Sequence, residues 1–419
     1  MDKFLKPLLT AAITLVTFLC GPSSAAAAEP VRFGLCYDLT KAYSFITPQF
    51  AQAVRDNAEL INSKGGLEGH PIEVIVRDHG NEPQRGIECY ERMKSEGVMV
   101  FDMLSTPVSR AVIPRVMKDG NVLIQAYGRG DAVDGDVFKW IFPLGPTWWG
   151  QAANDIAYIK QKSGGKLKGV KVAFFHIDTP FGRDPIPVLK ALAEKEGFEL
   201  TLVPFPVPGT DQASAWALMR RLNPDWIIGW SFSTMNVIAA REMKRNGIPI
   251  ERFIAVNAIN EVDIANIGGD AAKGIKRSTY VNGGSNNSLI QRILSELYDK
   301  NKGSGDRKNA NDVYYNHGLA VSSTVYEGMR LAIKNEGWPL TPAKIKAGLE
   351  SLKNYDANGL MAPITVTAQD HGGGGKTRIE MWDGTKWVAQ TDWFAAYQDE
   401  IWKTVKEQSA EFAKTEMPR

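Results

Sequence analysis

The feature that most constrains the fold of this chain is a regular alternation of short apolar runs with longer amphipathic segments. The apolar runs have the length of buried strands and cover residues 31–37, 72–77, 98–104, 122–127, 170–177, 199–205, 226–230, 253–257 and 274–281. Helical periodicity fills most of the gaps between these runs. Such alternation is typical of parallel sheets that are covered by helices on both faces. The sequence therefore predicts an α/β fold.

The last third of the chain departs from this rhythm. Two long helical stretches, at residues 311–335 and 342–352, interrupt the strands. The segment "TRIEMWDGTKWVAQ" that follows them predicts a β-hairpin that turns on Asp383-Gly384. From Asp392 onward the pattern is that of an amphipathic helix rich in aromatic residues. We therefore expect residues 392–419 to form a C-terminal helical tail.

The N-terminal segment, residues 1–28, has the pattern of a secretory signal peptide. Lys3 and Lys6 precede an apolar run at residues 8–20, and small residues follow up to Ala28. The apolar run is short for a membrane anchor, which is one alternative. A lipoprotein that begins at Cys20 is the other, but the large side chains of Phe18 and Leu19 fit poorly before a cleavage site. We expect cleavage near Ala28 and a periplasmic location.

Charge and size limit the classes of function. The formal net charge is +2 on 419 residues, so the chain has no basic field for nucleic acid. After cleavage about 390 residues remain, which is more than one hydrophobic core usually supports. The mature chain is therefore expected to form two lobes.

Two cysteines, Cys36 and Cys89, remain after cleavage, and they form either one disulfide or two buried thiols. The cysteines and the five histidines have no zinc-like spacing, so no metal or other cofactor is expected and the histidines are interpreted as surface or core residues. The sequence contains no Gly-x-Ser-x-Gly, no His-Glu-x-x-His and no phosphate loop. The chain is therefore not expected to be an enzyme. The histidines are His70, His79, His176, His317 and His371.

Polar and aromatic residues follow the predicted strands, where ligands collect in open parallel sheets. They come from both halves of the chain, so we expect them to meet in a cleft between two lobes. Trp148-Trp149 is expected either to stack on the ligand or to pack where the lobes meet. The candidate ligand-binding residues are Tyr43, Phe45, Ser105, Thr106, Tyr127, Gly128, Arg129, Phe181, Phe232 and Asn257.

The order of several segments resembles the solute-binding proteins of branched-chain-amino-acid-type ABC transporters, which have the type I periplasmic binding fold. The resemblance covers nearly the whole mature chain. It is carried by "VRFGLCYDLTKAYS", "NAELINSKGGLEGHPIEVIVRDHGNEPQRG", "STPVSRAVIPRV", "VAFFHIDTPFGRD", "IGGDAAKGI" and "GLMAPITVTAQDHGG".

The resemblance implies two doubly wound parallel-sheet lobes that are joined by three crossover strands and close on a small ligand. Lobe 1 would comprise residues 29–146 and 282–361, and lobe 2 residues 147–281 and 362–391. The resemblance also implies that the partners are the permease subunits of an ABC transporter. We expect a monomer.

The resemblance also assigns roles within the site. Ser105 and Thr106 stand where the family holds a ligand carboxylate through hydroxyls and backbone N–H groups, and the helix that begins at Pro107 would present a positive dipole end there. Tyr127, Gly128 and Arg129 form the loop after the fourth strand, which adds further contacts. Phe45, with Tyr43 beside it, and Phe181 match aromatic positions of the family, and Phe232 lies near another.

Two departures from the family pattern bear on the ligand. Asn257 stands where amino-acid binders carry an acidic residue that pairs with the ligand's amine, and Arg129 replaces a small hydroxyl residue. Both favour a carboxylate without an amine. The aromatic residues near the cleft favour an aromatic or other flat apolar body for it. One alternative is a binder of a neutral amino acid or amide, with Glu261 or Asp263 as the amine's partner. The other is a periplasmic sensor subunit that acts with a receptor.

Overall fold

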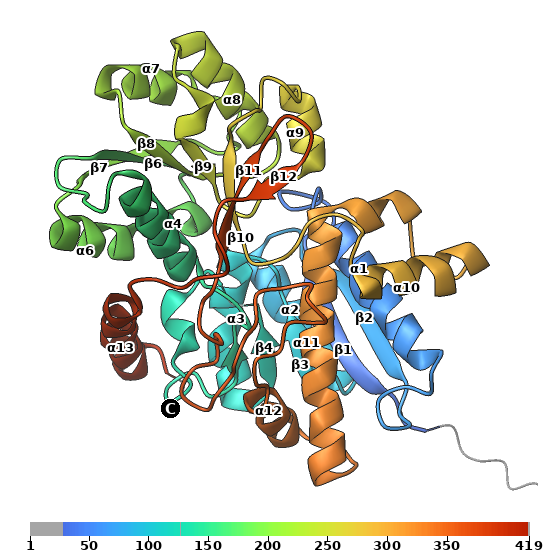
Figure 1. Cartoon of the computed structure of the whole chain (residues 1–419). Coiled ribbons are helices and arrows are strands. Elements are labelled where there is room, and N and C mark those ends of the chain that lie inside the picture. Colours follow the sequence, from blue (N-terminus) through green and yellow to red (C-terminus); the bar gives the residue numbers. More distant parts are fainter. Residues whose placement is uncertain (1–27, 126, 418–419) are drawn as a thin grey trace, which may run out of the picture.

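The computed structural model describes residues 28–125 and 127–417 and arranges them around two sheets (Figure 1). The first sheet has the order β2-β1-β3-β4-β5 and is parallel throughout. Its strands are β1 (Val31–Tyr37), β2 (Ile72–Asp78), β3 (Val100–Asp102), β4 (Val122–Ile124) and β5 (Ile141–Phe142).

The second sheet has the order β12-β11-β10-β9-β8-β6-β7. Its strands pair in parallel from β7 to β10, and β11 and β12 add an antiparallel hairpin at one edge. These strands are β6 (Lys171–Ile177), β7 (Glu199–Phe205), β8 (Trp226–Trp230), β9 (Phe253–Ala255), β10 (Lys276–Thr279), β11 (Arg378–Trp382) and β12 (Trp387–Ala389).

Helices cover both sheets, and each sheet with its helices forms one half of the molecule. The first half contains β1–β5 with α1 (Thr47–Asn62), α2 (Pro83–Ser95), α3 (Thr106–Asp119), α10 (Ser288–Glu296), α11 (Val313–Glu336) and α12 (Pro342–Glu350). The second half contains β6–β12 with α4 (Trp148–Lys162), α5 (Pro180–Arg183), α6 (Ile186–Glu196), α7 (Ala213–Leu222), α8 (Thr234–Asn246) and α9 (Glu261–Ile267). Short 3₁₀ turns lie at Gly130–Val133, Ile250–Arg252, Tyr298–Lys300 and Arg307–Asn311.

The two halves have separate apolar cores, and the first half has one on each face of its sheet because successive side chains of a strand point to opposite faces. In β1, Phe33 and Leu35 pack with α1 and α11, whereas Cys36 joins the cluster under α2 and α3. The chain crosses between the halves three times: between β5 and α4, between β10 and α10, and between α12 and β11. The carboxyl ends of the parallel strands in both sheets therefore face the region where the halves meet.

The predicted elements agree with the structure in type, with differences at their ends. The hairpin forms as predicted, with Asp383 and Lys386 closing its turn. β3 and β4 are shorter than predicted because the chain turns away to reach the helices and loops that follow, and the two-residue strand β5 was not predicted. Cys36 and Cys89 form a disulfide with a Cα–Cα distance of 6.4 Å, which resolves the two alternatives left by the sequence.

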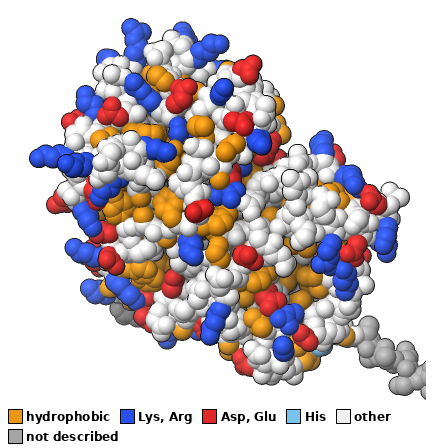
Figure 2. Space-filling model, viewed as in Figure 1, with side chains coloured by type: hydrophobic (Ala, Val, Ile, Leu, Met, Phe, Trp, Pro, Cys, Tyr) orange, Lys and Arg blue, Asp and Glu red, His pale blue; other side chains and the backbone are white. Residues whose placement is uncertain are grey.

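The predicted tail contains the helix α13 (Gln398–Thr415), which lies against both halves. Ile401 and Val405 join the core of the second half, and Phe412 joins a core of the first half. The predicted signal peptide lies almost wholly outside the described residues. Among the residues that are described, no helix is long and apolar enough to cross a membrane. On the face shown in Figure 2, basic and acidic side chains are interspersed, in keeping with the small net charge.

Candidate functional site

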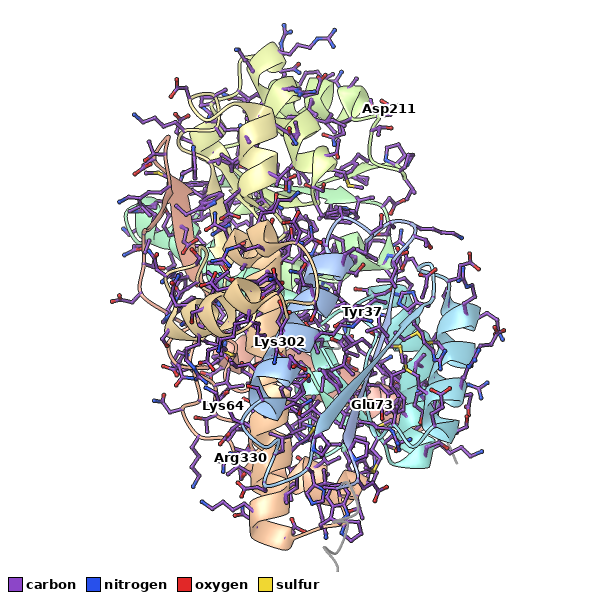
Figure 3. All side chains as sticks on the ribbon, turned by 90° about the vertical axis from the view of Figure 1, so that its right-hand side faces the viewer. Tyr37, Lys64, Glu73, Asp211, Lys302 and Arg330 are labelled. Atoms are coloured by element: carbon purple, nitrogen blue, oxygen red, sulfur yellow. A yellow bond between two sulfur atoms is a disulfide. The ribbon has the colours of Figure 1, made fainter. Side chains whose placement is uncertain are left out.

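A cavity lies between the two halves, at the carboxyl ends of the parallel strands. Figure 3 shows Tyr37, the last residue of β1, near this junction, whereas Glu73, near the start of β2, lies farther down in the first half. The cavity volume is about 90 Å³. Its walls are Tyr43, Ile46, Phe50, Leu104, Ser105, Thr106, Ser109, Gln125, Tyr127, Gly128, Trp148, Phe181, Phe232, Asn257, Ala258, Tyr280, Tyr314 and His317.

Eight of the ten residues predicted from the sequence line this cavity. They are Tyr43, Ser105, Thr106, Tyr127, Gly128, Phe181, Phe232 and Asn257. Phe45 lies just behind the wall, where its ring stacks on Phe232 with 5.3 Å between centroids. Arg129 is the tenth, and the structure does not bring it to the cavity.

Arg129 packs under the C-terminal helix instead of facing the cavity, which corrects the role predicted for it. Its guanidinium lies 4.3 Å from the ring centroid of Phe412 and pairs with Asp131 and Glu416. A guanidinium that already pairs with two carboxylates and packs on an aromatic ring has few N–H donors free for a ligand. The predicted carboxylate contact at Arg129 is therefore replaced by a structural contact to α13.

The loop before α3 places two hydroxyls at the cavity, but only one of them is open to a new partner. Ser105 Oγ caps the helix by accepting the Val108 N–H and donates to Asn81 Oδ1 at 2.7 Å. Pro107 contributes no N–H to the helix start. Thr106 lies against Gly128, where an added Cβ would come within 2.2 Å of Thr106 Oγ1. Glycine at position 128 therefore leaves room for the Thr106 side chain.

Aromatic rings from both halves form the walls. Tyr43 meets Phe232 across the junction at 5.4 Å between centroids, and Trp148 lies 5.3 Å from Phe181 and 5.7 Å from Tyr127. Trp148 is therefore a wall residue. Trp149 is a packing residue whose Nε1–H donates to the Asp184 carbonyl. Trp149 therefore takes the packing role, and Trp148 stands where stacking on a ligand is expected.

Polar contacts also join the halves on either side of these rings. Arg110 of α3 pairs with Asp184, which follows α5. Asn260, which caps α9, donates to Asp312, which caps α11, at 2.9 Å. The structure therefore has the halves in contact on either side of the cavity.

None of the described residues that line the cavity is Asp, Glu, Lys or Arg. The carboxyl groups nearby are engaged elsewhere. Asp102 accepts from Tyr37, Gln125 and the Leu104 N–H, and burial raises its pKa to about 7. Burial also raises the pKa of Asp263 to about 7 and that of Asp312 to about 6.

Glu261, the other predicted partner for an amine, lines a separate groove beside Arg277, and neither it nor Asp263 lines the cavity. That groove lies between the β11–β12 hairpin and the start of α10. Within the described residues no cluster of His, Cys, Asp and Glu could hold a metal ion.

The sequence analysis considered Trp148 but missed several other wall residues. Four wall residues carry buried polar atoms with no protein partner. These are Gln125 Oε1, Trp148 Nε1, Tyr314 OH and both ring nitrogens of His317. An unpaired buried polar group costs about 1–3 kcal/mol, and more than about 90% of such groups are satisfied in native proteins. Because these four side chains line one cavity, their polar atoms are candidates for contact with a ligand. The one signal that could have found two of them is the spacing of Tyr314 and His317, three residues apart in the predicted helix.

Comparisons with known proteins agree with this geometry. The sequence profile of a family described as periplasmic binding protein matches residues 30–386. A crystal structure described as an ABC transporter permease from the Pseudomonas fluorescens group is 32% identical, with a TM-score of 0.85, covering 93% of this chain and 99% of that chain. Among curated protein sequences, none shows significant similarity to the chain.

Two more distant structures share the fold. A branched-chain amino acid ABC transporter protein from Thermus thermophilus with bound valine is 18% identical, with a TM-score of 0.79, covering 90% of this chain and 99% of that chain. A solute-binding protein from R. palustris in complex with benzoate is 17% identical, with a TM-score of 0.68, covering 88% of this chain and 98% of that chain.

Proposed function

The chain belongs to the periplasmic binding protein family, and from that premise we propose that it captures a small amine-free carboxylic acid with a flat apolar body. The acid would bind between the two halves and be passed to the permease subunits of an ABC transporter. The observation that carries this proposal is the cavity wall itself, which is aromatic on most sides and, among the described residues, has no charged side chain.

The wall disfavours an amino acid as ligand. An ammonium group needs acceptors and a negative charge when it is buried, and without them the desolvation cost is large. Asp102, Asp263 and Asp312 stand behind the wall, and burial raises the pKa of each. None of the three lines the cavity, so none is placed to pair with an ammonium there.

The donors in the wall suit a carboxylate. The indole Nε1–H of Trp148 can only donate, and it has no acceptor in the protein. Thr106 adds a hydroxyl from the loop before α3. A carboxylate accepts hydrogen bonds only, so these donors match it, as in buried carboxylates that are held by neutral donors.

The cavity volume of about 90 Å³ limits what the closed arrangement can hold. An engineered apolar cavity of about 150 Å³ is enough to accept benzene. A ligand of one aromatic ring would therefore enter only as the halves part, and they would close on it afterwards. This favours single-ring acids and their short homologues over long-chain ligands.

A thermal-shift screen of the mature protein tests the proposal. Benzoate-type, phenylpropanoid and short aliphatic acids form one arm of the panel, and leucine, isoleucine, valine and simple amides form the other. A ligand at a hundredfold excess over its Kd stabilises the folded protein by about 2.7 kcal/mol. We expect stabilisation by the aromatic acids. Stabilisation by the amino acids alone would reject the proposal and would mean that Asp263 or Asp312 reaches the amine after all.

Thr106→Ala is expected to weaken binding of the best acid by about tenfold to a hundredfold, with little change in stability. The reason is the loss of one charge-assisted hydrogen bond of about 1.5–3 kcal/mol. Isothermal titration calorimetry measures the change. Ser105→Ala is the matched control, because Ser105 Oγ is committed to the helix cap. It should lower stability by about 0.5–2 kcal/mol and alter affinity less than Thr106→Ala does. The reverse order would show that Ser105 is the carboxylate contact.

A further inference from the structure

The helix α11 contributes two of the unpartnered polar groups to the cavity. Tyr314 and His317 are three residues apart, so their side chains lie on the same face of the helix. Both side chains line the cavity and are almost fully buried, at 2% and 1% relative exposure. The Tyr314 hydroxyl and both His317 nitrogens lack a protein partner. One turn of α11 thus presents a pair of unsatisfied polar side chains at the cavity.

The surroundings of His317 keep its imidazole neutral. Phe50 of α1 lies parallel to the ring with 5.9 Å between centroids, and Tyr280 lies edge-on at 4.6 Å. Burial first, and then the charge of Arg277, lowers the pKa of His317 to about 3. A neutral imidazole offers one donor and one acceptor. The group that satisfies it must therefore accept one hydrogen bond, donate one, or do both.

The surroundings of Tyr314 argue against a ligand carboxylate at this end of the cavity. Burial, and after it the charges of Asp263, Asp312 and Glu261, raises the pKa of the Tyr314 hydroxyl. Those carboxyl groups would repel a second anion placed beside the hydroxyl. A neutral group that both donates and accepts fits Tyr314 and His317 equally well, and a hydroxyl is the smallest such group.

We propose that Tyr314 and His317 form a hydroxyl-binding subsite, so that the preferred ligand is an aromatic acid with a neutral hydroxyl group on its ring. This inference rests on the proposed function. The acid would face the donors Thr106 and Trp148, and the hydroxyl would satisfy the pair on α11. A site built to bond a hydroxyl discriminates against the analogue that lacks it, because the buried protein groups are then left unpaired.

The test compares matched probes that differ only in the hydroxyl: benzoate with its 3- and 4-hydroxy forms, and 3-phenylpropanoate with its ring-hydroxylated forms. Titration calorimetry gives Kd for the wild type and for Tyr314→Phe and His317→Phe. We expect at least one hydroxylated acid to bind the wild type tenfold or more tightly than its parent. Each substitution should reduce that ratio to below about threefold, chiefly by weakening the binding of the hydroxylated acid.

Tyr315→Phe is the matched control, since it makes the same chemical change one position along α11. The Tyr315 hydroxyl donates to Asp56 at 2.7 Å inside the first half. This variant should lower Tm by about 2–4 °C and keep the hydroxyl preference. Tyr314→Phe removes a hydroxyl that has no partner, so its ligand-free Tm should not fall. The opposite pattern would assign Tyr314 a structural role and overturn the subsite.

Other outcomes also separate this inference from the proposed function. If parent and hydroxylated acids bind equally well, the subsite is rejected and the acid-binding function stands. If affinity falls about tenfold per unit between pH 6 and 8, a ligand carboxylate lies against a protonated His317, and the subsite is again rejected. If amino acids bind and no acid does, the proposed function itself fails, and this inference fails with it.

Discussion

Phe412→Ala is expected to lower the free energy of unfolding by about 3–5 kcal/mol, the range for removing a buried phenylalanine. Phe412 stands near the end of α13, yet its side chain is 1% exposed. Its ring stacks on Phe138 at 4.5 Å between centroids, and the Arg129 guanidinium covers it at 4.3 Å. Urea denaturation measures the loss. Glu411→Ala, an exposed neighbour on the same turn, should change stability by less than about 0.5 kcal/mol.

The same substitution should also weaken ligand binding, although Phe412 is not a wall residue of the cavity. The start of α13 is held by the second half through Ile401 and the Glu400–Lys195 ion pair. Its end is held by the first half, where Ser409 donates to Asp134 at 2.6 Å beside Phe412. Movement of one half relative to the other must therefore displace one end of the helix.

Because α13 is docked when the halves are in contact, it favours that arrangement. Freeing its end should reduce the binding-competent population, and the apparent affinity falls with that population. Equal affinities for Phe412→Ala and the wild type would show that α13 contributes to stability alone.

The position of α13 also explains why the sequence analysis assigned Arg129 to the ligand site. A strand-end arginine beside a hydroxyl-rich loop is a reasonable carboxylate ligand on local grounds. Its actual partners, Phe412 and Glu416, lie more than 280 residues along the chain. Amphipathic periodicity predicts that a helix has an apolar face, but it does not say which surface covers that face.

The wall contributed by strand-end loops could be predicted because ligand sites in parallel sheets have a fixed relation to strand polarity. Thr106, Phe181 and Asn257 all lie within four residues of the end of a strand, and all three line the cavity. The wall contributed by α11 could not be predicted in the same way. Whether Tyr314 and His317 face a cavity or a core depends on how the helix lies over α1 and the first sheet, which is a property of packing between elements. The sequence analysis left His317 as a surface or core residue and assigned no role to Tyr314.

Removing the disulfide is expected to cost about 4 kcal/mol of stability. Cys36 and Cys89 are 53 residues apart, and the bond restricts a loop of that length in the unfolded chain. Cys36→Ala/Cys89→Ala is the suitable variant, since both side chains lie in an apolar cluster with Tyr90, Met93 and Phe101. Denaturation of the wild type with and without a reductant, beside the variant in both conditions, isolates the covalent contribution.

The reductant should lower the stability of the wild type toward that of the variant and leave the variant unchanged. Two thiols that react with a maleimide in the unreduced, unfolded mature protein would contradict the bond.

Removal of the disulfide should also affect the ligand site. Cys36 immediately precedes Tyr37, and the next segment anchors Tyr43 and the start of α1 through Asp38, which accepts the Tyr43 N–H at 2.8 Å. Without the disulfide, the end of β1 is less restrained and that wall of the cavity can move. The variant should therefore bind ligand more weakly than the oxidised wild type under conditions where both are fully folded.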